Sequence, residues 1–117
     1  MRNTDKAAAK AAILAAVQAA IELAHTDETG SAWVLLIDPT GWEGAPRLAV
    51  ASGAREPSRQ LGPGIEPPAL MWLATLRRGT PRAEAVAVVE REMRRGGGGI
   101  YVPVADVRVD NPVMRFA

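Results

Sequence analysis

The sequence predicts a small single α+β domain whose elements follow the order α-β-β-α-α-β. Three observations indicate this class: an alanine-rich helical period near the start, two apolar segments around a turn signal, and helix-start signals ahead of two later apolar segments. A chain of 117 residues buries about two thirds of its unfolded surface, which is enough for one core. We find no internal repeat and expect one domain over residues 1–117.

Residues 4–25 form the first predicted helix, with Thr4 as its N-cap. Its larger apolar side chains recur every three or four positions and share one face: Ile13, Leu14, Val17, Ile21 and Ala24. The many alanines raise the helix propensity and let a neighbouring backbone approach closely. We therefore expect a helix that packs tightly on the domain or pairs with a copy of itself.

Two strands are expected next. Residues 32–37 are apolar on both faces, which is typical of a central strand covered on both sides. The turn signal Asp38-Pro39-Thr40-Gly41 follows, and residues 47–52 fit the returning strand of a hairpin. The strand that contains Trp33 should be the centre of a small mixed or antiparallel sheet.

Residues 53–66 are rich in Gly, Pro, Arg, Glu and Ser and show no apolar period, so we predict a mobile loop there. Pro67 and Pro68 then favour the start of a short helix that runs to Arg78 and stops at Gly79.

A second later helix is expected over residues 80–95, with Thr80 as its cap and Pro81 as its first residue. The four glycines at 96–99 predict a helix stop, because phosphate-binding glycine loops have the opposite polarity and precede a helix. Residues 100–109 then fit one or two strands broken by Pro103, a residue of edges and bulges.

The composition excludes several chemistries. The chain has no cysteine, so disulfides, thiolate metal sites and thiol catalysis are excluded. A net charge of +1 argues against a strongly basic nucleic-acid binder. Lysines interrupt the alanine-rich run, and no stretch reaches about 18 uninterrupted apolar residues, so we expect no signal peptide, no membrane span and a cytoplasmic protein.

Catalytic groups are sparse. His25 is the sole imidazole and would have to serve Ser31, Ser52 or Ser58, none of which has nucleophile-elbow spacing. The carboxylate pairs fit solvated surface charges better than acid/base couples: Asp27 with Glu28, Glu90 with Glu92, and Asp106 with Asp110. We expect no catalytic residue, no cofactor and no metal site.

Arginine is the more informative charge, because six of the chain's twelve arginines lie within residues 77–95. A guanidinium favours bidentate contacts with carboxylate or phosphate, although an ordinary solvated helix face has the same composition. Trp42, at the expected hairpin tip, is either an exposed anchor or a lid on the core. The candidate partner-binding residues are Trp42, Arg77, Arg78, Arg82, Arg91, Arg94 and Arg95.

The segment 84–103 combines a helix, a glycine run and the strand Tyr101-Val102-Pro103. It resembles the dimerisation region of the Mor family of phage transcription activators over about 20 residues, at a helix-to-strand junction of common type. The resemblance implies a unit that helps two subunits associate, in a family that contacts DNA through a helix-turn-helix downstream of this strand. Fourteen residues follow Pro103, so we expect no helix-turn-helix and carry over no sequence-specific DNA binding.

The sequence therefore predicts a non-enzymatic interaction protein that binds a protein partner, as a small phage-type regulator or inhibitor and as a homodimer. The alternative is a nucleic-acid-binding protein that uses the basic face from Arg77 to Arg95. The third reading is a small enzyme with a concave site lined by Asp38, Glu43 or His25.

Overall fold

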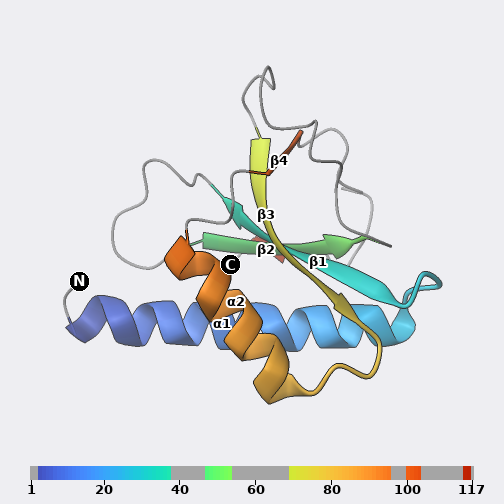
Figure 1. Ribbon diagram of the computed structural model, residues 1–117, viewed down its shortest axis with the longest axis horizontal. Coiled ribbons are helices and arrows are strands. Elements are labelled where there is room, and N and C mark those ends of the chain that lie inside the picture. The colour runs from blue at the N-terminus through green and yellow to red at the C-terminus, as the bar shows by residue number, and fades with distance from the viewer. Residues whose placement is uncertain (1–2, 38–46, 54–68, 96–99, 104–114, 117) are drawn as a thin grey trace.

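A computed structural model describes residues 3–37, 47–53, 69–95, 100–103 and 115–116. Two helices lie on one face of a five-stranded sheet (Figure 1). The α+β class is confirmed. The elements in chain order are α1 (Asn3–Thr26), β1 (Ser31–Ile37), β2 (Arg47–Ser52), β3 (Ala69–Arg77), α2 (Arg82–Arg95), β4 (Tyr101–Pro103) and β5 (Arg115–Phe116).

The strand order is β4-β3-β1-β2-β5, and each described pairing is antiparallel. Strand β1 lies at the centre, as its apolar composition predicts, and pairs with β2 from Ala32↔Ser52 to Ile37↔Arg47. The predicted hairpin is therefore confirmed in its strands. The turn signal at 38–41 and Trp42 lie outside the described residues.

Both faces of β1 are buried, because its side chains alternate between two apolar clusters. Val34 and Leu36 point toward the helices and belong to the larger cluster. Leu35 belongs to the cluster on the opposite face and is 0% exposed. An uninterrupted apolar run is what a strand needs when water reaches neither of its faces.

Helix α1 lies across one face of the sheet with its N-terminal turns beyond the strands (Figure 1), and its buried residues run from Ile13 to Ala24. Ile13, Val17 and Ala24 are buried as predicted, whereas Leu14 and Ile21 are only half-buried at the edge of the contact. The centre of the contact contains the small side chains Ala16 and Ala20, together with Leu23. Small residues bring the helix backbone close to the sheet, so the alanines serve packing within the chain.

The length and hydropathy of α1 are also those of a membrane-spanning helix. Residues Lys6–Thr26 have a mean hydropathy of 1.5, and they are the one such segment in the described part of the chain. Core helices of soluble proteins and N-terminal signal sequences share these properties. In the structure, one face of α1 packs on the sheet, and 33% of the segment is buried.

The helix predicted over residues 67–78 is wrong, because Ala69–Arg77 forms strand β3. This strand pairs with β1 along its length and with β4 at Ala69, Leu70 and Met71. Its apolar run is buried on both faces, and such a run carries no period that separates a helix from a strand.

Strand β3 contains a β-bulge. The register with β1 shifts so that Val34 faces Ala74 and Leu35 faces Trp72, which leaves Leu73 as the extra residue. Leu73 and Ala74 consequently both join the cluster under the helices, whereas Leu70 belongs to the opposite face.

A tight turn connects β3 to α2. Gly79 adopts the left-handed φ of 89°, and the carbonyl of Arg77 accepts the Thr80 N–H (3.0 Å) and the Thr80 hydroxyl (2.7 Å). The helix expected over residues 80–95 is confirmed as α2, which begins at Arg82. Its predicted stripe faces the core: Val86 and Val89 are buried, and Met93 packs beside them.

The sheet face opposite the helices has its own apolar cluster. Leu35, Ala49, Ala51, Leu70 and Val102 are buried there, and the predicted core residues Trp33 and Trp72 pack against them. Gly53 follows β2 at a point where an added Cβ would lie 2.3 Å from three atoms of the Trp33 indole. Only glycine leaves room for that ring.

Strand β4 lies at one end of the strand order, which agrees with the expectation that Pro103 marks an edge. Strand β5, which the sequence did not predict, pairs with β2 at the other end through Ala49 and Val50. Several predicted features lie outside the described residues: loop residues 54–66, the glycines 96–99 and strand residues 104–109.

Candidate interaction surface between helices α1 and α2

The six arginines within residues 77–95 do not form one continuous face. Arg77 ends β3, one residue after Leu76, whose side chain lies under the helices. Because strand side chains alternate, Arg77 projects from the opposite side of the sheet. The other five arginines lie in three separate settings, which differ in what the guanidinium contacts.

Arg78 stabilises the C-terminal end of α1. Its Nε donates to the carbonyl oxygen of Ala24 (3.2 Å) and its Nη2 to that of Asp27 (2.8 Å), while its backbone N–H donates to Gly30 (2.7 Å). The last carbonyls of a helix lack partners within the helix, and a cation complements the negative end of its dipole. Arg78 therefore has a structural role inside the chain.

A cluster of polar side chains lies beside the C-terminal end of α1 and consists of Asp27, Thr29 and Ser52. The Ser52 hydroxyl donates to Asp27 Oδ1 (2.8 Å), and Asp27 Oδ2 accepts the Thr29 N–H (3.0 Å) and the Thr29 hydroxyl. His25 is exposed in the last turn of α1. In the part of the chain that the structure describes, no three His, Cys, Asp or Glu side chains could hold a metal ion together. The Ser52–Asp27 bond links the segment that follows α1 to strand β2.

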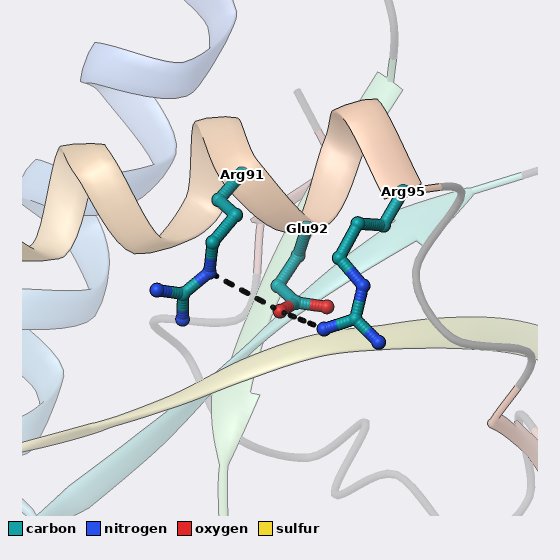
Figure 2. A network of polar contacts seen from close by, with 3 residues as sticks. All are labelled: Arg91, Glu92 and Arg95. Atoms are coloured by element: carbon teal, nitrogen blue, oxygen red, sulfur yellow. Dashed lines mark hydrogen bonds and ion pairs between the residues drawn. The ribbon is translucent and has the colours of Figure 1, made fainter.

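Arg91 and Arg95 share one carboxylate on α2. Figure 2 shows both guanidinium groups directed at Glu92, with distances of 3.7 Å from Arg91 Nε and 3.2 Å from Arg95 Nη1 to the same Oε1. The Glu92 side chain is 14% exposed, whereas the two arginines are 60% and 64% exposed. Their local charge is partly neutralised, although exposed pairs of this kind add little stability.

Arg82 and Arg94 lie where α2 meets α1, and the described residues provide no ion-pair partner for either. They line two hollows at the α1–α2 seam, together with Lys6 and Lys10 of α1. Lys10 donates to Glu90 across the seam (3.2 Å), and these two residues line both hollows.

The two hollows are similar in size and have apolar floors. The first, of about 550 Å³, is lined by Lys10, Leu14, Arg82, Ala83, Val86, Ala87 and Glu90. The second, of about 530 Å³, is lined by Lys6, Ala9, Lys10, Ile13, Glu90, Met93 and Arg94. Glu90 is the one acidic residue among the described lining residues, against four cations. The seam therefore combines exposed apolar surface with an excess of positive charge.

Sequence reasoning found half of this surface. Arg82 and Arg94 were candidates, but their partners on α1, Lys6 and Lys10, were missed because 72 residues separate Lys10 from Arg82 along the chain. One signal was present: Lys6 and Lys10 are four residues apart and therefore share a flank of the helix. Nothing in a single sequence shows which other helix lies along that flank.

Comparisons with known proteins add no relative: no family model, curated protein or solved structure matches this chain.

Proposed function

We propose that the protein is a non-enzymatic, cytoplasmic interaction module that binds an acidic segment of a protein partner at the α1–α2 seam. The observation that carries this proposal is the pair of apolar hollows bordered by Lys6, Arg82 and Arg94 with Glu90 as the sole described acid. Unmatched cations beside apolar surface complement a ligand that is both acidic and apolar. A small regulator or inhibitor of a larger assembly would act through such a contact.

A protein ligand suits this surface better than a nucleic acid does. Nucleic-acid binding draws on a continuous stripe of cations that follows the phosphate backbone. Here Arg78 contacts the end of α1, and Arg91 and Arg95 share Glu92. The cations that remain at the seam border apolar floors, which phosphates would not use.

The proposal that the protein is not an enzyme is based on the polar cluster of Asp27, Thr29 and Ser52 beside the end of α1. Asp27 accepts the Ser52 hydroxyl and the Thr29 N–H, and His25 is exposed in the last turn of α1. The competing reading of a small enzyme also names Asp38 and Glu43, which lie outside the described residues.

Self-association remains part of the proposal through the unit that resembles the Mor dimerisation region. Its strand β4 lies at the end of the sheet, where a copy could pair with it. Light scattering after size exclusion tests this: a species of twice the chain mass of 12.4 kDa supports the dimer, and a monomer refutes it.

The binding proposal is tested by fluorescence anisotropy with two labelled probes on the full chain. One is an acidic, leucine-containing peptide of about 18 residues, and the other a DNA duplex of about 20 base pairs, each titrated at about 50 and about 200 mM salt. We expect the peptide to bind more tightly than the DNA at both salt concentrations.

Two double variants with the same charge change locate the site. Arg82→Glu with Arg94→Glu should weaken peptide binding at least about tenfold, because both cations at the seam are reversed. The matched control, Arg91→Glu with Arg95→Glu, should change it less than about threefold. Equal losses in both would place the site elsewhere, and tighter DNA binding with a steep salt dependence would establish the nucleic-acid alternative instead.

A further inference from the structure

The two hollows lie in a row along α2, one on each side of the Lys10–Glu90 ion pair. The α2 residues that line them are centred roughly seven residues apart, or about 10 Å at the helical rise of 1.5 Å per residue. The cations at the two ends, Arg82 and Arg94, are twelve residues apart in the sequence, or about 18 Å along the helix axis. The surface thus has a defined order: cation, hollow, ion pair, hollow, cation.

We infer that the occupant of this seam is an amphipathic helix of a partner protein, with two apolar anchors seven residues apart and an acidic residue beyond each anchor. This inference rests on the proposed function and specifies the chemistry of the partner. Two side chains at i and i+7 of a helix project from the same face about 10 Å apart, which matches the separation of the hollows. Acids two or three positions outside the anchors would reach Arg82 and Arg94.

A helix suits the seam better than an extended peptide. An extended peptide that binds by adding a strand takes its affinity from backbone hydrogen bonds to a sheet edge. The surfaces of α1 and α2 present side chains only, because the backbone groups in the middle of a helix bond to each other. A bound helix satisfies its own backbone and needs only side-chain contacts, so it loses no hydrogen bonds when it displaces water from the floors of the hollows.

A second copy of the chain is a poorer occupant. In a two-fold symmetric contact the same seam would face itself, so the cations Lys6, Arg82 and Arg94 of one copy would face the cations of the other. Like charges placed together across an interface are unfavourable. Any dimer of this protein should therefore use a different surface, such as the edge at β4.

Three peptides of identical charge test the inference against the full chain by anisotropy. The first carries two leucines seven residues apart with glutamates outside them; the second has its leucines three residues apart; the third equals the first with a central proline. We expect the first to bind at least about tenfold more tightly than the others, because three-residue spacing fills one hollow only and proline breaks the helix.

A blocking variant confirms where the peptide lies. Ala87 is exposed and lines the first hollow, so Ala87→Phe should lower the affinity for the first peptide at least about tenfold. Ala11→Phe adds the same ring to an exposed alanine of α1 that lines neither hollow, and should leave affinity within about twofold. Circular dichroism and thermal unfolding of both variants verify that each is folded.

The outcomes separate this inference from the proposed function. If all three peptides bind equally and Arg82→Glu with Arg94→Glu weakens them all, the helical inference is overturned while the acidic-partner function stands. If none of the peptides binds, both are overturned. Equal effects of the two phenylalanine variants would also overturn the assignment of the anchors to these hollows.

Discussion

The two ends of α1 lie beside arginines from the same stretch of sequence, but these arginines differ in what their guanidinium groups contact. At the C-terminal end, Arg78 donates to the carbonyls of Ala24 and Asp27, and its position is determined by the chain itself. Along the N-terminal half, Arg82 and Arg94 border apolar hollows and have no ion-pair partner among the described residues. One region uses positive charge to hold the fold together, and the other presents it to solvent.

The difference shows why counting arginines does not locate a binding surface. Arg78 and Arg82 are four residues apart, yet a glycine turn and the start of a helix direct them to different neighbours. What distinguishes them is the acceptor within reach. The loss of a cation that bonds helix carbonyls should reduce stability, and the loss of one at the seam should reduce binding only.

The largest effect on stability is expected for Asp27→Ala, which removes the acceptor of the Ser52 hydroxyl and of two Thr29 donors. Three hydrogen bonds to one half-buried carboxylate would be lost, at a cost of about 2–3 kcal/mol in the free energy of unfolding. Urea unfolding followed by circular dichroism measures it. The neighbouring exposed carboxylate provides the control: Glu28→Ala should cost less than about 0.5 kcal/mol. Equal costs would show that the hydrogen bonds of Asp27 with Thr29 and Ser52 add no stability.

Arg78→Ala comes next, with an expected loss of about 1–2 kcal/mol, because charge-assisted bonds to two helix-end carbonyls disappear at a partly solvated site. The comparison variant is Arg82→Ala, which should leave the free energy of unfolding unchanged within about 0.5 kcal/mol. In peptide binding the order should reverse, with Arg82→Ala the weaker binder. If Arg78→Ala had the larger effect on both unfolding stability and peptide binding, the two regions would not differ in function.

Much of the fold could be predicted from the sequence where one local signal decided each element. The alanine-rich period predicted α1, the apolar run of residues 32–37 predicted β1, and Thr80-Pro81 predicted the start of α2. In each case the local preference and the tertiary structure agree, which is the condition under which patterns are reliable.

Strand β3 shows where that reasoning ends. Pro67-Pro68 and the stop at Gly79 favoured a helix, but pairing with β1 and burial on both faces produced a strand with a bulge. The bulge is a property of the pair of strands and leaves no mark in one of them. The binding surface has the same limitation, since Lys10 and Arg82 are brought together only by the way two helices pack on one sheet.

The smallest expected effect concerns the ion pair that divides the seam. Glu90→Gln keeps the side-chain shape but removes the one described negative charge of the lining and releases Lys10. The side chains of Lys10 and Glu90 are 51% and 32% exposed, so unfolding stability should change by less than about 0.5 kcal/mol. Affinity for the acidic peptide should rise about two- to fourfold, because a repulsive charge is lost and a cation is freed. Lys10→Gln provides the opposite test and should lower affinity by a similar factor. A fall in affinity with Glu90→Gln would mean that the Lys10–Glu90 pair shapes the two hollows for the ligand, and that the seam works through its geometry more than through its net charge.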